Sequence, residues 1–346
     1  MRKTDSIVSG AVAILAAISI FLAFTPQKAM AQQTFNWRLQ SVWRTPATQD
    51  GLKLFAENVG KATNGRVKIK VYAANELVKI KATRGAVQSG AIEMACEAGA
   101  YIQRVIPEAD VEFGLPFSWR NWNEAWEAWT KYGLQEKLRE AYAEKGLYII
   151  TIQPAAEYAL MTTKPVRTAG DLKGLKIRTW GTTAKILKTL GAAPTMIPGA
   201  EQYVALQRGT VDGTVYPVFV LDAYKLKEVI RYVILPSIIS PPTTEIYINL
   251  KVWEGLSPDL QKAINEAATQ HQATMDKRYL EEGYMAVGRF VMTGLGEAIV
   301  LPESEVKKIR KAALAEWDEL AAKSPRCKEL VDVMKRFMAD KGIAAE

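Results

Sequence analysis

The chain has 346 residues, of which 49% are hydrophobic and 24% are charged, and its formal net charge is +8. At roughly 150 residues per domain, this length is sufficient for two lobes with a sizeable core. Lysine and arginine are spread along the whole chain and interleaved with acids, so they form no basic stripe. The composition therefore excludes nucleic acid as the expected partner and fits a bias toward anionic solutes.

Residues 1–31 have the three parts of a secretory signal peptide. Arg2 and Lys3 give a basic start, residues 7–24 are apolar, and Ala29-Met30-Ala31 is a small-x-small cleavage signal. A membrane-spanning helix is the alternative, because the apolar run approaches the ~20 residues that cross a bilayer. The cleavage signal favours removal, and no cysteine lies beside it to carry a lipid anchor. We expect a mature protein in the periplasm that is not embedded in the membrane. The leader carries three basic residues and one acid, so its loss lowers the net charge from +8 to +6.

The first lobe is expected over residues 32–154. Apolar spacing predicts strands and helices that alternate along the chain. In order, these are a strand at 35–41, a helix at 49–63, a strand at 67–72, a helix at 81–90, a strand at 92–95, a long helix at 123–145 and a strand at 147–152. The chain then crosses to the second lobe.

The second lobe is expected over residues 155–244, and residues 245–346 follow it. The predicted elements of the second lobe are a strand at 175–179, helices at 183–190 and 201–207, and a strand at 211–215. A strand at 245–250 then returns to the first lobe. Long amphipathic helices at 257–289 and 303–339 are expected to brace both lobes.

A short pattern occurs twice and predicts the architecture. Residues 86–93 match residues 205–212 position for position, as alanine, aliphatic, glutamine, any residue, glycine, any residue, β-branched aliphatic and acid. In each copy the glycine, Gly90 or Gly209, can end a helix in the left-handed conformation. Repeated strand–helix–strand units predict two α/β lobes with a cleft between them, at the carboxyl ends of the strands.

Several motifs together resemble the solute-binding proteins of the tripartite ATP-independent periplasmic (TRAP) transporters, the family typified by the C4-dicarboxylate binder. The motifs span nearly the whole mature chain: Leu115-Pro116-Phe117, residues 168–178, Leu190-Gly191-Ala192, residues 205–213, and Trp253 with Leu256-Ser257. The resemblance implies a two-lobed periplasmic-binding-protein fold that captures an organic acid. The lobes would close around it and deliver it to a membrane permease driven by an ion gradient.

Arg178 is the predicted carboxylate anchor. Strand alternation places Lys176, Arg178 and Trp180 on one face, so Arg178 is not required in the core. Its planar fork can hold a carboxylate through two parallel hydrogen bonds, and the resemblance implies that role. The alternative is a surface arginine paired with a neighbouring acid.

Three departures from the family pattern bear on the ligand. Tyr216 stands where many members have an asparagine, and it can still donate a hydrogen bond. A relative that binds oxo acids with a metal has Glu-Trp at the positions of Val215 and Tyr216, so we expect neither a metal nor another cofactor. A second arginine found in some members would fall near Ala159, where nothing is basic. These departures favour a monocarboxylate with an aromatic or otherwise hydrophobic tail.

Other candidate binding residues surround the expected cleft. Rings are contributed by Trp43, Tyr158, Trp180 and Phe219, and two charged residues, Arg44 and Glu97, are candidate polar contacts. Ring burial at ~25 cal/mol/Å² would supply much of the affinity. Core packing is the alternative for each ring, and an exposed loop position is the alternative for Glu97.

Enzyme activity is not expected. The single histidine, His271, falls in the C-terminal helical region, where we expect it to be solvated or to cap a helix. Glu93 and Asp212 occupy equivalent positions of the repeat and are expected to serve the fold. A periplasmic hydrolase is the rival class, whereas a C4-dicarboxylate binder, a sugar-acid binder and the ligand-binding partner of a membrane sensor are rivals within binding. We expect a monomer. Cys96 and Cys327 can form either a disulfide or two separate thiols.

Overall fold

The computed structural model describes residues 33–239 and 241–343. The predicted signal peptide, residues 1–31, lies outside the described residues. Within these ranges no helix combines the length and the apolar character needed to cross a bilayer.

The first lobe is built on a mixed five-stranded sheet. Its order is β2-β1-β3-β10-β4, with β1 and β3 parallel and β10 antiparallel to both of its neighbours. The strands are β1 (Phe35–Ser41), β2 (Val67–Tyr72), β3 (Met94–Glu97), β4 (Leu147–Pro154) and β10 (Thr243–Asn249). Strand β10 follows the second-lobe strands in the chain and lies between β3 and β4 of this sheet.

The second lobe is built on a six-stranded sheet of order β11-β9-β5-β8-β6-β7. Its strands are β5 (Tyr158–Thr162), β6 (Lys176–Arg178), β7 (Ala193–Thr195), β8 (Gly213–Pro217), β9 (Tyr232–Ile239) and β11 (Glu297–Val300). Sequence patterning does not detect β5, because all five of its residues are buried and no alternation marks it. The boundaries assigned to the lobes from the sequence stay predictions.

Helices cover both sheets. Those next to the first sheet are α2 (Pro46–Ala62), η1 (Ile80–Ala82), α3 (Thr83–Gln88), α4 (Gly99–Ile102), α5 (Ala109–Phe113), α6 (Trp122–Lys131), α7 (Leu134–Ala143) and α11 (Leu250–Glu254). Those of the second lobe are η2 (Ala169–Leu172), α8 (Gly181–Thr189), η3 (Gly199–Glu201), α9 (Gln202–Gln207), α10 (Val220–Ala223) and η4 (Leu226–Glu228).

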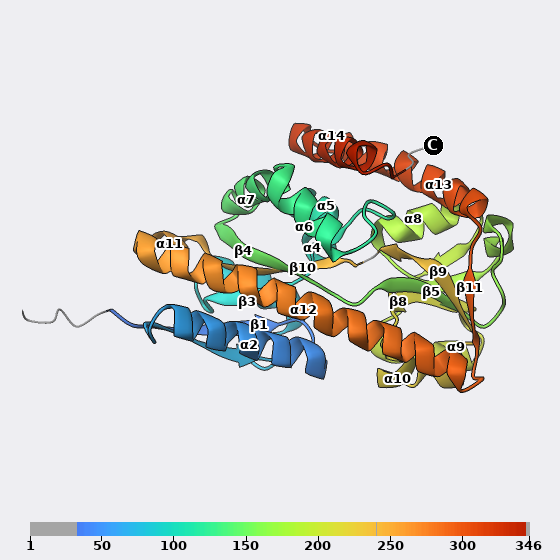
Figure 1. The fold of residues 1–346 in the computed structure, drawn as a ribbon, viewed down its shortest axis with the longest axis horizontal. Coiled ribbons are helices and arrows are strands. Elements are labelled where there is room, and N and C mark those ends of the chain that lie inside the picture. Colours follow the sequence, from blue (N-terminus) through green and yellow to red (C-terminus); the bar gives the residue numbers. More distant parts are fainter. Residues whose placement is uncertain (1–32, 240, 344–346) are drawn as a thin grey trace, which may run out of the picture. The chain divides into compact units, whose positions relative to one another are not determined.

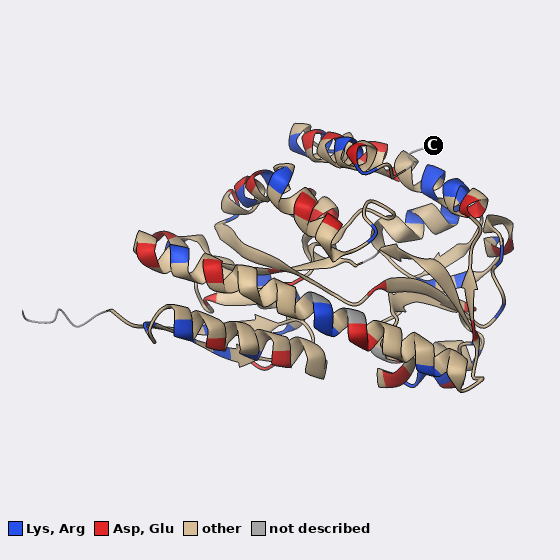
Figure 2. Ribbon diagram, in the orientation of Figure 1, with Lys and Arg blue, Asp and Glu red and all other residues tan. Residues whose placement is uncertain are grey.

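The C-terminal helices connect the lobes. Helix α12 (Pro258–Met292) packs on α2 and β4 of the first lobe and on α10 and β11 of the second (Figure 1). Helix α13 (Glu303–Ala321) packs on α8, whereas α14 (Pro325–Asp340) packs on α7. The predicted brace is confirmed. Lys and Arg are interspersed with Asp and Glu along α13 and α14 (Figure 2).

Two long helices predicted from the sequence are each divided in two. The helix predicted at 123–145 breaks into α6 and α7, because Gly133 adopts a left-handed φ of 85° between them. The stretch predicted at 303–339 breaks before Pro325, where the Ser324 hydroxyl accepts a hydrogen bond from the Cys327 backbone. In both cases a local turn interrupts an otherwise continuous apolar pattern.

The repeated pattern has the structural role predicted for it. Gly90 and Gly209 take left-handed φ values of 76° and 68° at the ends of α3 and α9. Glu93 pairs with Arg38 at 2.8 Å, and Asp212 pairs with Lys164 at 2.9 Å. Both acids therefore stabilise the fold.

Two crossing segments meet beside the cleft. The chain passes from β4 to β5 through Ala155, and the backbone N–H of Ala155 donates a 2.8 Å hydrogen bond to the carbonyl of Pro242, which precedes β10.

Both cysteines are buried free thiols, Cys96 in β3 and Cys327 in α14, which resolves the alternative left open by the sequence.

Candidate functional site

Arg178 ends strand β6 and is buried, with 6% of its surface exposed. Strand alternation does not require Arg178 in the core, but the structure buries it against Trp180 and Tyr216. Its Nε–H donates to the carbonyl of Ile197 at 2.9 Å, which fixes the plane of the guanidinium. Its Nη1 is buried and has no hydrogen-bond partner among the described residues.

The guanidinium lies between two aromatic rings. Its Cζ is 4.4 Å from the ring centre of Trp180 and 4.6 Å from that of Tyr216. Such cation–π contacts favour a buried cation but leave its N–H groups free in the plane. Burial lowers the pKa of Arg178, and the surrounding phenols of Tyr216, Tyr158, Tyr101 and Tyr224 partly oppose that effect. An arginine nevertheless keeps its proton in a protein.

Tyr158, Trp180 and Tyr216 form a ring cluster around the arginine, with each pair of ring centres 6.0 Å apart. Tyr158 and Tyr216 come from the paired strands β5 and β8. Trp180 is the residue before α8. Gly199 makes room for Tyr216, because a Cβ atom at Gly199 would lie 2.6 Å from the Tyr216 hydroxyl oxygen.

A cavity opens beside this cluster, between the two lobes, and we call it the cleft cavity. Its free space, counted together with the open solvent at its mouth, is about 530 Å³. Residues from both lobes line it: Trp43, Thr45, Thr48, Gln153, Ala155, Ala156, Tyr158, Tyr216, Pro217, Phe219, Tyr224, Thr244 and Tyr279. None of these side chains is charged.

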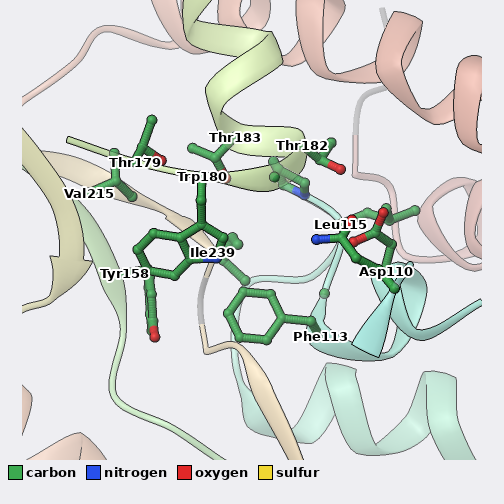
Figure 3. A pocket seen from close by; sticks show the side chains of 14 residues that line it. Asp110, Phe113, Leu115, Tyr158, Thr179, Trp180, Thr182, Thr183, Val215 and Ile239 are labelled. Atoms are coloured by element: carbon green, nitrogen blue, oxygen red, sulfur yellow. The ribbon is translucent and has the colours of Figure 1, made fainter. Parts of the chain in front are cut away.

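A second cavity lies on the other side of Tyr158 (Figure 3). The rings of Trp180 and Phe113 face it, and Asp110 and Thr182 lie at its opposite side. Asp110 is buried and pairs with Lys323 at 3.5 Å. Burial raises the pKa of Asp110, although the Lys323 charge opposes that shift.

The structure brings most of the predicted binding residues together. Trp43, Tyr158, Tyr216 and Phe219 line the cleft cavity, and Trp180 lines the second cavity. Arg178 lines neither cavity, but its guanidinium contacts Tyr216 of the first and Trp180 of the second.

Arg44 and Glu97 lie apart from these cavities. Arg44 is exposed and lines neither one. Glu97 belongs to β3 rather than to an exposed loop, and it accepts a 2.8 Å hydrogen bond from the Tyr247 hydroxyl. Burial raises the pKa of Glu97 to about 7.

Sequence reasoning missed the polar residues of the first-lobe wall. Thr48 lies on α2, Gln153 near the end of β4, and Tyr279 on α12. The place of Gln153 in the site was predictable, because ligands of α/β sheets bind at the carboxyl ends of strands. The place of Tyr279 was not predictable, since it depends on how α12 packs against the two lobes.

The sequence model of one protein family matches most of the chain. The family is described as bacterial extracellular solute-binding protein, family 7, and the match covers residues 42–324. The monocarboxylate 2-oxoacid-binding periplasmic protein of Nostoc sp. is 26% identical over 310 residues, which are 87% of this chain and 84% of that protein. The C4-dicarboxylate-binding periplasmic protein of Rhodobacter capsulatus is 27% identical over 224 residues, 64% of this chain and 66% of that protein.

Solved structures have the same fold. A TRAP periplasmic solute-binding protein from Rhodobacter sphaeroides, in an apo open form, superposes with a TM-score of 0.78 at 26% identity. The superposition covers 90% of this chain and 100% of that one. It confirms the predicted fold class of two α/β lobes with long C-terminal helices.

Proposed function

Because the chain belongs to the bacterial extracellular solute-binding proteins of family 7, we propose that it captures an organic monocarboxylate with an aromatic or hydrophobic body and holds the carboxylate at Arg178. The ligand then passes to the membrane permease of a TRAP transporter.

Family membership confirms the broader predictions. The protein is a periplasmic TRAP solute-binding protein, which binds small organic acids and works with a membrane permease. The family and the relatives are solute-binding receptors and not enzymes. The rival reading as a periplasmic hydrolase is therefore set aside.

The unpartnered Nη1 of Arg178 carries the ligand proposal. A buried guanidinium cannot become neutral by losing its proton, so a missing anion leaves its desolvation uncompensated. Its Nε–H is used by Ile197, whereas its Nη1 has no partner in the described part of the chain. A ligand carboxylate supplies both the charge and the acceptors that this group lacks.

The cleft cavity favours one carboxylate over two. Arg178 adjoins the cavity at the Tyr216 ring and can pair with one carboxylate, whereas no side chain lining the cavity is charged. A second carboxylate placed there would therefore be buried without a cation. The second family arginine is expected near Ala159, which is buried and pairs with Tyr216 across strands β5 and β8. Trp43, Phe219 and Tyr158 offer apolar walls in which one ring can bury ~150 Å², worth about 4 kcal/mol at ~25 cal/mol/Å².

A sugar acid is the second candidate, and the second cavity favours it. Asp110 and the Thr182 and Thr183 hydroxyls lie there together with the ring of Trp180. A carboxylate and two hydroxyls suit the several hydroxyl groups of a sugar acid. The names of the relatives do not favour one ligand class over the other. The Nostoc protein is named for monocarboxylate 2-oxoacids, and the Rhodobacter capsulatus protein for C4-dicarboxylates.

A thermal-shift screen of the mature protein tests the proposal. A ligand at 100 times its dissociation constant stabilises the folded state by ~2.7 kcal/mol. Aromatic and branched monocarboxylates should raise Tm, and succinate and malate should not. A response to dicarboxylates alone would overturn the proposal, and a response to sugar acids alone would favour the second candidate.

A further inference from the structure

The first-lobe wall of the cleft cavity contains a hydrogen-bonded pair that the ligand proposal does not use. Gln153 in β4 and His271 in α12 are both buried, and His271 Nε2 is 2.7 Å from Gln153 Oε1. Gln153 lines the cavity, whereas His271 lies behind it, with its ring 5.4 Å from that of Phe55. The expectation that His271 is solvated or caps a helix is therefore wrong.

The burial of His271 fixes which way this hydrogen bond runs. Burial lowers the pKa of His271 to about 4, so the ring is neutral and carries one N–H. Its Nδ1 is buried without a partner. A proton on Nδ1 would leave an orphaned buried donor, so the proton belongs on Nε2 and is donated to the Gln153 oxygen.

This arrangement directs the Gln153 amide nitrogen away from the histidine. Its Nε2 donates to the Cys96 sulfur at 3.5 Å, a long contact to a weak acceptor. A primary amide has two N–H groups, so one remains for the cavity that Gln153 lines. Reversing the amide would either break the histidine bond or move the histidine proton to Nδ1, where it has no acceptor among the described residues. Either cost holds the donor in place.

Neighbouring hydroxyls extend this polar wall. Thr45 and Thr48 are linked at 2.7 Å between their Oγ1 atoms, and Thr48 Oγ1 is 3.2 Å from the Tyr279 hydroxyl. Three hydroxyls joined by two hydrogen bonds leave one hydroxyl hydrogen free. The wall therefore offers neutral donors without a cation, whereas Pro217 and Phe219 of the second lobe add apolar surface to the cavity.

We propose that Gln153 selects monocarboxylates that carry a neutral oxygen acceptor, such as a hydroxyl or a carbonyl, at the end remote from Arg178. His271 acts as a positioning residue by holding the Gln153 amide in its donating orientation. The inference rests on the proposed monocarboxylate function and deepens it, because it names the group at the other end of the ligand.

The test compares probes in which a hydroxyl replaces a methyl group of nearly equal size. One pair is para-hydroxyphenylacetate and para-methylphenylacetate, and the other is omega-hydroxyhexanoate and heptanoate. Calorimetry gives a dissociation constant for each probe. The unaltered protein should prefer the hydroxyl member of at least one pair by about 3- to 10-fold, the range that a neutral hydrogen bond supports.

Three variants separate selection from general damage. Gln153→Met should remove the preference, and His271→Phe should weaken it by releasing the amide. Gln202→Met is the matched control, because Gln202 is equally buried but lies in α9, outside the cavity lining. A merely structural loss lowers affinity for both members of a pair and leaves their ratio unchanged.

Each outcome decides something. Equal or tighter binding of the methyl probes, or a preference that survives Gln153→Met, overturns the inference while the monocarboxylate function stands. A preference lost in Gln153→Met but kept in His271→Phe overturns the positioning role of the histidine. If none of the four probes binds, the proposed function fails and the inference fails with it.

Discussion

Each lobe buries ionisable side chains that have no ion-pair partner among the described residues. In the second lobe this side chain is that of Arg178. In the first lobe it is an acidic trio, Glu97 of β3, Glu112 of α5 and Glu245 of β10, on the face of the sheet that packs against α7.

The acidic trio can neutralise itself. The carboxyls of Glu112 and Glu245 hydrogen-bond each other, and the Tyr142 hydroxyl donates to Glu112 at 2.6 Å. Burial raises the pKa of all three carboxyls, so they keep protons that exposed acids would lose. The trio therefore needs no external partner.

Arg178 has no such solution, because a guanidinium stays charged. Its environment supplies two ring faces and one carbonyl but no anion. The contrast teaches that a buried ionisable group indicates a charged ligand only when the group cannot become neutral by gaining or losing a proton. This is the reason to place the ligand carboxylate at Arg178 and to leave Glu97 out of the site.

The largest expected effect comes from replacing the arginine. Arg178→Met should weaken binding of the monocarboxylate that performs best in the screen by roughly 1,000-fold, about 4 kcal/mol, because a buried charge pair loses one member. Calorimetry measures the change. Arg44→Met is the control. Because Arg44 is exposed and lines neither cavity, the affinity of this variant for the same monocarboxylate should change less than twofold. Equal losses in the two variants would contradict the assignment.

The acidic trio gives the next largest effect, through pH. Glu97 has an ordinary pKa of 4.5 and a folded-state pKa of about 7. The folded state then binds the extra proton, so stability falls as pH rises from about 4.5 to 7. Denaturant unfolding should show that Glu97→Gln removes about 3 kcal/mol of this fall.

Glu93→Gln is the matched control with the opposite sign. Burial raises the pKa of Glu93, but hydrogen bonds from Arg38 outweigh it and hold the pKa below its ordinary value. The stability that Glu93 contributes is present above its ordinary pKa and is lost as pH falls. If both variants changed the slope in the same direction, Glu97 would not be the protonated group described here.

A smaller effect is expected on the ligand-free protein. Arg178→Met removes a buried cation without an anion, and the lost cation–π contacts offset part of that gain. The free energy of unfolding should rise by about 1–2 kcal/mol, and Tm by a few degrees, in the absence of ligand. A lower Tm would show that the contacts of the guanidinium within the protein already compensate its burial.

The smallest effect concerns the ring that covers the arginine. Gly199→Ala places a methyl group against the Tyr216 hydroxyl and should tilt the ring, which weakens monocarboxylate binding about tenfold. Gly170→Ala is the control, because its nearest contact would be 3.5 Å away. Adding Tyr216→Phe to Gly199→Ala should recover part of the affinity, and no recovery would mean that the ring is not the cause.

The sequence predicted the features that local chemistry determines. Strands β1 and β2 follow alternating patterns, and Gly90 and Gly209 end their helices because they accept a positive φ. Arg178 was recognised as a candidate because its planar fork suits a carboxylate and because the family resemblance implies that role. Its chemical character could be read locally, although its burial could not, since Ile197 and Tyr216 cover it only after the sheet has formed.

The remaining features depend on contacts between distant segments. Glu97 faces Tyr247, which lies 150 positions away, and Gln153 faces His271, which lies 118 positions away. No pattern along the chain specifies which side of a buried strand meets which helix. The acidic trio and the Gln153–His271 pair therefore required the three-dimensional structure.

One measurement tests the central claim most directly: the affinity of the best monocarboxylate compared with that of its primary amide, by calorimetry. The two molecules share size and shape, and only the acid carries the anion that Arg178 lacks. The account predicts that the amide binds at least about 100-fold more weakly to the unaltered protein, and that Arg178→Met binds the two alike. An amide that binds the unaltered protein within a few-fold of the acid would contradict it.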